Sequence, residues 1–169
     1  MEVIIRTARV SDLEEIYSVE TSCFQKQFQI SYDYYKLALN TYSKYFYLLF
    51  VDHILVGFIN AMPTNKKDLT DSMLKGISDY KKDGNNLMII GLMVLPEYQH
   101  HGYATRLMNR FIRVSREEGK KRIVLTCRKE LIDFYKKFGY IYQGISDSVL
   151  GDEVWYQLKL ELDDDDDYQ

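Results

Sequence analysis

The sequence has few of the residues that build disulfide frameworks, metal sites and membrane spans. Its 169 residues include two cysteines, two prolines and three histidines. Cys23 and Cys127 lie far apart and neither belongs to a C-x-x-C pair, so we expect reduced thiols and no metal. No apolar run approaches the roughly 20 residues of a membrane-spanning helix, and the first residues lack the apolar stretch of a secretory signal. We therefore expect no membrane partner and a cytoplasmic location.

Charge of one sign accumulates only at the end of the chain. The net charge is −3, and five of the 25 acidic residues form the run Asp163 to Asp167. Without that run the 22 basic residues slightly outnumber the acidic ones, and no concentrated basic footprint points to nucleic acid. Like charges repel, so we predict that residues 163–169 are an acidic disordered tail. Residues 1–162 are expected to be a single domain, since this length suits one hydrophobic core.

The spacing of apolar residues predicts an alternation of strands and helices. Short apolar runs and alternating patterns indicate strands, whereas apolar residues three or four apart indicate helices. The expected strands cover residues 3–8, 45–52, 54–62, 87–94, 122–127, 140–146 and 152–162. The expected helices cover residues 11–20, 31–40, 102–118 and 129–140, and the polar segment 66–86 has a helical centre. Ser11 and Glu14 predict a capping box for the first helix, and a tight turn is expected near Asp52 and His53.

The order of these elements predicts an α/β (α+β) class. A parallel β-α-β step in the second half implies a single mixed, twisted sheet covered by helices. Residues 87–94, LMIIGLMV, form an apolar run that suits a central strand buried on both faces. Ligands in such sheets bind beyond the carboxyl ends of strands, where neighbouring strands part. The loop after Val94 is therefore the first place to look for a site.

That loop lies in the stretch VLPEYQHHGYATRLMNRF, residues 94–111. A strand that stops at Val94, a loop with Gly102, and a helix from Tyr103 would present free N–H groups and a positive helix end to an anion such as phosphate. The loop lacks G-x-G-x-x-G and G-K-[ST], so it is neither a dinucleotide fingerprint nor a P-loop. On these residues alone, an anion site and an ordinary strand-to-helix connection both stay open.

The stretch LMVLPEYQHHGYATRLM resembles the acyl-coenzyme A signature of the GCN5-related N-acetyltransferase (GNAT) superfamily. After an apolar strand and x-P comes [QR]-x-x-G-x-[GA], which is met by Gln99, Gly102 and Ala104. RIVLTCRKELIDFYKKFGY resembles the following strand and helix of that family, with F-Y-x-x-x-G-[FY]. Within the superfamily the chain is most similar to the arylalkylamine (serotonin) N-acetyltransferases, through LTCRKELIDFYKKFGY, ILVGFI before KKDLTDSML, and GISDSVLGDEVWYQLKLEL. The resemblance implies about seven strands with splayed central strands.

The resemblance also implies an enzyme that transfers an acetyl group from acetyl-coenzyme A directly to a primary amine. The acceptor would be a small molecule, an arylalkylamine or a polyamine-like amine. Backbone N–H groups from His100 to Thr105 would bind the pyrophosphate, and the strand edge near Leu92 would bind the pantetheine arm and polarise the thioester. The implied coenzyme residues are Leu92, Met93, Val94, Gln99, His100, His101, Gly102, Tyr103, Ala104 and Thr105.

Tyr135 matches the family's tyrosine that protonates the departing thiolate. A phenol has a pKa of about 10 and a thiol about 8.5, so a neutral phenol is present at neutral pH and its position matters more than its acidity. Cys127, at the end of a buried strand, is expected to be a small core residue rather than a nucleophile. Arg128 stands where many family members have a coenzyme-contacting asparagine, so that side-chain contact is not expected.

The general base is where the chain departs from its relatives. The arylalkylamine group has two histidines on the central strand, whereas Met88 and Ile90 occupy the aligned positions here. Many other members use a glutamate on that strand, and LMIIGLMV has none. Either Glu20, Asp33 or Glu97 acts through water, or the enzyme takes the small neutral fraction of the amine. His100 and His101 are expected to keep solvated side chains.

Aromatic residues are the candidates for an acceptor pocket. Phe24 and Phe28 follow the first helix, and residues 31–50 hold six of the fifteen tyrosines, which can form an aromatic wall or simply pack in the core. Two other functions stay open. One is acetylation of a peptide or protein amine, which needs an open groove. The other is a non-catalytic acyl-coenzyme A sensor. The chain is expected to be a monomer or a homodimer.

Overall fold

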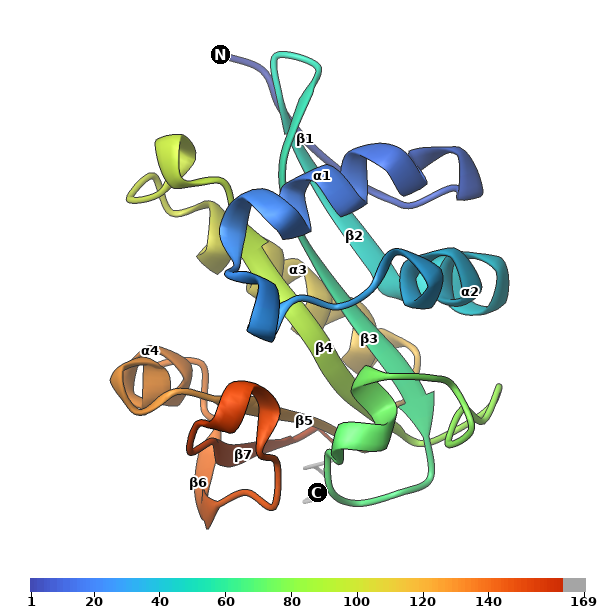
Figure 1. The fold of residues 1–169 in the computed structure, drawn as a ribbon, viewed down its shortest axis with the longest axis vertical. Coiled ribbons are helices and arrows are strands. Elements are labelled where there is room, and N and C mark those ends of the chain that lie inside the picture. Colours follow the sequence, from blue (N-terminus) through green and yellow to red (C-terminus); the bar gives the residue numbers. More distant parts are fainter. Residues whose placement is uncertain (163–169) are drawn as a thin grey trace.

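The computed structural model describes residues 1–162, which form a seven-stranded sheet with helices on both faces (Figure 1). The strands lie in the order β1-β2-β3-β4-β5-β7-β6, and every neighbouring pair is antiparallel except β4 with β5. The predicted single mixed sheet of about seven strands is thereby confirmed. The predicted acidic tail, residues 163–169, lies outside the described residues.

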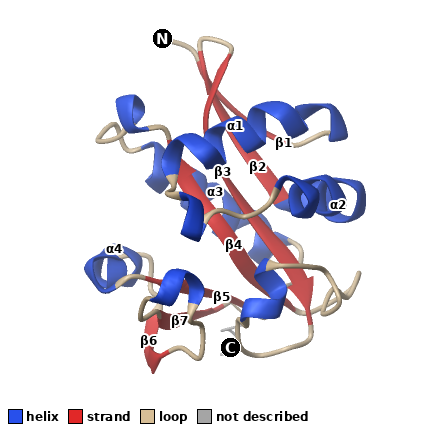
Figure 2. Ribbon diagram, viewed as in Figure 1, coloured by secondary structure: helices blue, strands red, loops and turns tan. Residues whose placement is uncertain are grey.

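The strands and helices follow the predicted order (Figure 2). However, the helix expected over residues 129–140 is a 3₁₀ turn, Lys129–Leu131, followed by a short α-helix, and the last strand begins at Tyr156 rather than at residue 152. The strands are β1 Val3–Thr7, β2 Phe46–Val51, β3 Ile54–Thr64, β4 Asn86–Val94, β5 Arg122–Cys127, β6 Ile141–Ile145 and β7 Tyr156–Glu161. The helices are α1 Leu13–Cys23, α2 Tyr32–Tyr42, α3 Tyr103–Glu117 and α4 Ile132–Lys136. Short 3₁₀ turns join several of them.

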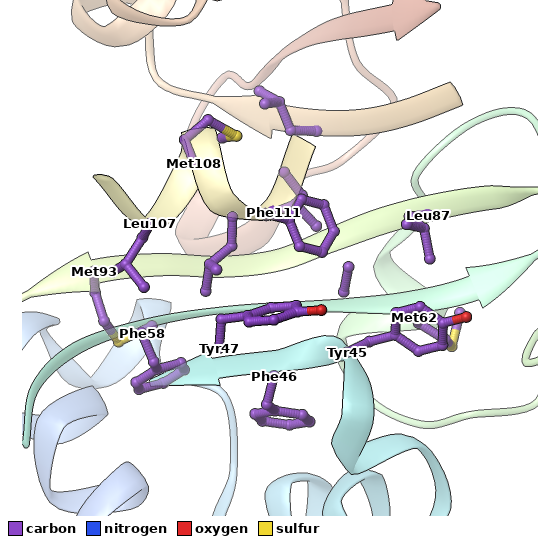
Figure 3. Close-up of a cluster of buried hydrophobic side chains, with 14 of the residues drawn as sticks. Tyr45, Phe46, Tyr47, Phe58, Met62, Leu87, Met93, Leu107, Met108 and Phe111 are labelled. Atoms are coloured by element: carbon purple, nitrogen blue, oxygen red, sulfur yellow. The ribbon is translucent and has the colours of Figure 1, made fainter. Parts of the chain in front are cut away.

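Helices α1 and α2 cover one face of the sheet, and α3 covers the opposite face (Figure 1). Strand alternation sends Phe46 and Phe58 to the first face, where both rings meet Tyr35 of α2 at centroid distances of 6.2 and 5.8 Å. Tyr47 points the other way and meets Phe111 of α3 at 6.1 Å (Figure 3). Each fully buried aromatic ring contributes roughly 1.5–3 kcal/mol, so these contacts help to hold α2 and α3 to the sheet, whereas the buried apolar residues of α1 are aliphatic.

Strands β4 and β5 are joined over a short length only. They pair in parallel from Asn86 to Met88 against Arg122 to Val124, and beyond these residues they part (Figure 1). The paired end is fixed by Arg122, whose guanidinium donates to Asn86 at 3.2 Å and to Glu161 at 3.0 Å. On the other side of β4, the register against β3 shifts so that Ile90 is an extra residue, a β-bulge. The predicted splayed central strands are confirmed.

Two further local predictions were wrong. The first helix begins at Leu13 rather than Ser11, because the Asp12 carboxylate accepts from the backbone N–H of Arg9 at 2.7 Å and from the Arg6 guanidinium at 2.9 Å. These hydrogen bonds lower the pKa of Asp12. The helical centre expected in residues 66–86 is only a 3₁₀ turn, Asp71–Leu74, since the segment is too polar to bury a helical face.

The β2–β3 turn generates a stability prediction, because Asp52 and His53 have φ values of 48° and 72°. A left-handed conformation costs an L-residue roughly 1–2 kcal/mol. His53→Gly should therefore raise the free energy of unfolding by about 1 kcal/mol, or roughly 2–4 °C in Tm. Thermal unfolding measures it, with His53→Ala as the control that also removes the imidazole, 3.5 Å from Glu2, but keeps the Cβ. Equal Tm values for the two variants would contradict the prediction.

Candidate active site

Two connected spaces open where β4 and β5 part. We call the first the loop groove; it has a volume of about 480 Å³ and lies between the end of β4, the following loop and α4. We call the second the sheet cavity; it has a volume of about 230 Å³ and lies between β4 and β5 under α1. Phe24, Leu92, Met93, Leu131 and Tyr135 line both spaces. The splayed strands thus form the floor of one continuous site.

The loop groove brings together the residues that the sequence singled out for a coenzyme. Every one of those residues except His101 lines it. The backbone turns sharply here, since His100 has a φ of 67° and Gly102 a φ of 80°, and α3 begins directly afterwards. The first N–H groups of this 15-residue helix therefore face an open space, and the helix dipole favours an anion there.

Gly102 is needed for its backbone conformation. A Cβ at this position would meet no protein atom within 4 Å, so crowding by the protein is not the reason for glycine. The reason within the chain is the left-handed φ, which an L-residue adopts only at a cost. The side of Gly102 that a side chain would occupy stays open.

Side chains of the loop hold it in this shape. Gln99 donates from Nε2 to the carbonyl of Val94 at 3.1 Å, and Cys23 Sγ donates to the same carbonyl at 3.5 Å. Nδ1 of His101 lies 2.8 Å from the carbonyl oxygen of Gln99, and its ring stacks on Tyr103 at 5.6 Å. The side chains of Gln99 and His101 thus stabilise the loop and leave its backbone N–H groups to face the groove. His100 has an exposed side chain.

Tyr135 lies where the two spaces meet. Its ring is 8% exposed and packs edge-on against Phe134 at 5.1 Å and Tyr140 at 5.9 Å, which fixes its direction. Burial raises the pKa of Tyr135, so its hydroxyl stays protonated at neutral pH and can act as a hydrogen-bond donor. Burial also raises the pKa of the neighbouring Cys127 thiol to about 12, which agrees with an unreactive core cysteine.

The three acidic candidates for a base are separated by the structure. Asp33 and Glu97 are exposed and line neither space. Glu20 is 1% exposed and lines the sheet cavity. Burial raises its pKa, although hydrogen bonds from Tyr35 and the Ile30 N–H oppose this effect. Glu20 follows Leu13 and Ile16 on the buried stripe of α1, and a glutamate on an apolar stripe was the sequence signal for it.

Met88 and Ile90, which the sequence resemblance aligned with two histidines, differ in their surroundings. Met88 is fully buried in the core, whereas Ile90 lies at the bulge and lines the sheet cavity. Neither can accept a proton. The acceptor side of the opening therefore has an apolar β4 wall, and its acidic group comes from α1.

Phe24 and Phe28 both line the sheet cavity, as expected for acceptor-pocket residues. The sequence did not single out Trp155, whose ring meets Phe28 edge-on at 6.1 Å and also lines the cavity. Arg128 lies over the Trp155 ring at 5.7 Å and pairs with Glu153 at 2.9 Å. These contacts join loops far apart in sequence, so no local pattern could have revealed them.

Within residues 1–162 no group of three or more His, Cys, Asp or Glu side chains could hold a metal ion. No helix among these residues is both long and apolar enough to cross a membrane.

Comparison with known proteins decides the family. A family described as "Acetyltransferase (GNAT) family" matches residues 13–140. The chain belongs to the acetyltransferase (GNAT) family. Membership supports an acyl-coenzyme A-dependent transferase activity with acetyl-coenzyme A as cosubstrate, and the prediction is confirmed at that level. The narrower resemblance to the arylalkylamine group is not shown.

Solved structures of GNAT proteins share the fold at low sequence identity. The loading GNATL domain of CurA from Lyngbya majuscula is 14% identical, with a TM-score of 0.83 and 96% of this chain and 98% of that chain covered. The GphF GNAT-like decarboxylase in complex with isobutyryl-CoA is 19% identical, with a TM-score of 0.83 and coverage of 94% and 99%. Arabidopsis thaliana Naa50 in complex with the bisubstrate analogue CoA-Ac-MVNAL is 19% identical, with a TM-score of 0.73 and coverage of 95% and 99%.

The loop groove generates a binding prediction. Gly102→Glu adds a negative charge where an anion is expected and strains a backbone with a φ of 80°. We expect it to raise the Kd for coenzyme A at least about tenfold, or ~1.4 kcal/mol, by isothermal titration calorimetry. Gly76→Glu is the matched control, since a Cβ there also meets no atom within 4 Å and its φ is not in the strained range. Equal affinity in the two folded variants would contradict a pyrophosphate site at this loop.

Proposed function

We propose that this GNAT protein transfers an acetyl group from acetyl-coenzyme A directly to the primary amine of a small molecule with an apolar or aromatic body. The observation that carries the proposal is that the loop groove and the sheet cavity meet at Tyr135. A thioester that lies in the groove and an amine that lies in the cavity would come together there. Bringing two reactants together in this way lowers the barrier by removing much of the entropy cost of their encounter.

The groove side would bind the donor. The N–H groups from His100 to Thr105 would bind the pyrophosphate at the start of α3. The pantetheine arm would follow β4 from Val94 towards Leu92, where β4 no longer pairs with β5. A backbone N–H on that free edge would donate to the thioester oxygen as negative charge develops on it.

The chemistry then needs one proton to leave the amine and one to reach the sulfur. The free amine attacks the thioester carbon, a C–N bond forms, and a tetrahedral intermediate collapses as the C–S bond breaks. Tyr135 donates its proton to the departing thiolate. The attacking nitrogen, which carries two protons in the free amine, loses one of them as the amide forms. Burial keeps the Tyr135 hydroxyl protonated but makes it a weaker acid than a thiol, so its role as donor depends on its position beside the sulfur rather than on its acidity.

The lining of the sheet cavity supports an aromatic amine as the acceptor. Phe24, Phe28 and Trp155 contribute aromatic rings, and Ile30 and Ile90 complete an apolar wall. The volume of about 230 Å³ compares with ~30 Å³ per water in the liquid, so a small organic molecule fits. This lining favours an arylalkylamine over a polyamine as the acceptor.

Contacts between the enclosing loops favour a small acceptor over a peptide. The segment before α2, which contains Phe28, contacts the segment before β7, which contains Gly151. The contact is so close that a Cβ at Gly151 would lie 2.4 Å from a ring carbon of Phe28. Asp71 holds the second loop through the Ser148 hydroxyl at 2.5 Å. A peptide would need these loops to separate, whereas a small amine needs only the cavity between them.

A second candidate is decarboxylation of an acyl-coenzyme A whose acyl group carries a carboxylate. Arg128 lines the sheet cavity, and its Nε is buried with no hydrogen-bond partner among residues 1–162. A guanidinium nitrogen in this state can bind a carboxylate. The GphF structure named a GNAT-like decarboxylase has the same fold. The candidate ranks second because Glu153 already pairs with Arg128.

Thiol release from acetyl-coenzyme A by the purified protein tests the proposal. Tryptamine, tyramine, spermidine, an aminoglycoside and a short peptide are offered in turn, and malonyl-coenzyme A is offered alone for release of carbon dioxide. We expect release with the two arylalkylamines to exceed that with the other acceptors. Release with the peptide alone, or decarboxylation without any amine turnover, would overturn the proposal in favour of the corresponding alternative.

Tyr135→Phe gives the prediction for the leaving group. Removing a proton donor of this kind lowers a rate by roughly 10²–10⁴-fold, so kcat should fall by at least about 100-fold while the Kd for coenzyme A stays within about twofold. Tyr140→Phe is the matched control, since its hydroxyl is also buried, donates to Met108 Sδ at 3.3 Å, and lines neither space. Unchanged kcat in Tyr135→Phe would remove the tyrosine from the reaction.

A further inference from the structure

We propose that Glu20 binds the ammonium group of the acceptor and accepts its proton, and that Tyr35 is the positioning residue for Glu20. The inference rests on the proposed amine acetylation and identifies the base that β4 lacks. It begins from a carboxylate that is 1% exposed yet lines the sheet cavity.

Glu20 is held by neutral donors only. Its Oε2 accepts from the backbone N–H of Ile30 at 3.0 Å, and its Oε1 accepts from the Tyr35 hydroxyl at 2.5 Å. Within residues 1–162, no Lys, Arg or His side chain forms an ion pair with it. A carboxylate has about four lone-pair positions, so two bonds leave capacity for a further donor. A buried carboxylate without a cation is costly, and a substrate ammonium would offset that cost.

The other residues that line the sheet cavity limit where an ammonium group can bind. Phe24, Phe28 and Trp155 are apolar or aromatic, and Arg128 carries a like charge. Glu20 is the one acidic side chain among the residues lining the sheet cavity within the described part of the chain. A protonated amine therefore has a single complementary group, with the aromatic rings left to contact its body.

A second observation is a buried amide, on the strand behind the cavity wall, that has no hydrogen-bond partner among the described residues. Asn60 on β3 is 0% exposed, and neither Oδ1 nor Nδ2 has a hydrogen-bond partner within residues 1–162. Asn60 pairs with Gly91, and a Cβ on Gly91 would lie 3.2 Å from Asn60 Oδ1 and 3.8 Å from the Tyr35 hydroxyl. Gly91 itself lines the sheet cavity. That Cβ on Gly91 would also lie 2.8 Å from Met93 Cε, so Met93, the Asn60 amide and the Tyr35 phenol fill the space beside Gly91.

Buried polar groups without partners are rare in folded proteins, because each one costs free energy. Glu20, Tyr35 and Asn60 come from α1, α2 and β3, so their arrangement is a product of tertiary structure. Of the three, Glu20 lines the sheet cavity, and an ammonium that enters the cavity would supply a further donor to its carboxylate. The Glu20 carboxylate thus has the chemistry of an amine-binding group.

The proton transfers balance as follows. The Glu20 carboxylate takes one proton from the ammonium and becomes a carboxylic acid, which leaves a neutral amine. The nitrogen attacks the thioester carbon, and when the C–S bond breaks the thiolate takes the Tyr135 proton. The second nitrogen proton restores Tyr135, and the proton on Glu20 leaves to solvent with the products. A raised pKa makes Glu20 a stronger base than an exposed glutamate.

The test compares Glu20→Gln, Glu20→Asp and the control Asp33→Asn, an exposed acid outside the site. In the wild type, kcat/KM for tryptamine should be nearly level at pH values above the raised pKa of Glu20 and below about 10.4, the Lys-like pKa of the amine. In Glu20→Gln only the free amine reacts, so kcat/KM should fall at least about 100-fold near pH 7 and rise about tenfold per pH unit. Glu20→Asp should recover a level profile at a lower rate.

Tyr35→Phe tests the positioning role through the pH dependence of kcat/KM, which would not change if Tyr35 only packed in the core. The Tyr35 hydroxyl lowers the pKa of Glu20, so its loss should shift the acidic limb of the kcat/KM profile to higher pH. Cys127, Arg128 and Tyr135 line the sheet cavity together with Glu20, and Cys23 and Tyr35 interact with Glu20 electrostatically. Burial raises the pKa of Cys23 to about 11 and that of Tyr35 well above its usual value. Neither of these groups titrates in the range measured.

The outcomes separate this inference from the proposed function. If the wild type releases no thiol with any amine, the proposed function falls and this assignment falls with it. If the wild type is active and Glu20→Gln keeps the same pH slope and the same coenzyme A affinity, only the role of Glu20 is overturned. If Glu20→Gln alone becomes steeply pH-dependent while Asp33→Asn follows the wild type, both stand.

Discussion

The parting of β4 and β5 after three paired residues is the constraint on which the rest of the site depends. Backbone groups in a sheet are normally satisfied by the neighbouring strand, and a central strand that loses its neighbour exposes polar backbone deep in the protein. Arg122 pins the closed end of the opening through Asn86 and Glu161. The open end is left for an extended ligand that can pair with β4 as a strand would.

The start of helix α3, which follows β4, forms the second part of the candidate site. Left-handed residues at His100 and Gly102 turn the chain so that α3 starts beside the strand end, and the Gln99 and His101 side chains hold that turn. A ligand with an anion at one end and an amide-containing arm would meet both features in sequence. The same backbone therefore supplies charge recognition through a helix start and directional recognition through a strand edge.

Features of the site that are formed by contiguous residues could be predicted from the sequence, whereas features formed by distant segments could not. The strand, loop and helix around Gly102 are contiguous, so periodicity and the loop motif placed them correctly. Trp155 reaches the cavity only because the loop before β7 packs on Phe28, a contact between segments more than a hundred residues apart. The predicted start of α1 was wrong because Asp12 accepts a hydrogen bond from Arg6 of β1, a partner outside the helix. The tail, residues 163–169, remains a prediction.

Glu20 is another residue whose surroundings could not be predicted from the local sequence. A glutamate among Leu13 and Ile16 on a buried helical stripe conflicts with the core pattern, and such conflicts concentrate at functional sites. What makes it a candidate base is the hydrogen bond from Tyr35 and its place in the lining of the sheet cavity, which depend on other elements. Since β4 carries only apolar side chains along Leu87 to Ile90, we propose that the proton acceptor comes from the covering helix α1, where Glu20 lies. An acid–base group on α1 would leave the opening between β4 and β5 unchanged.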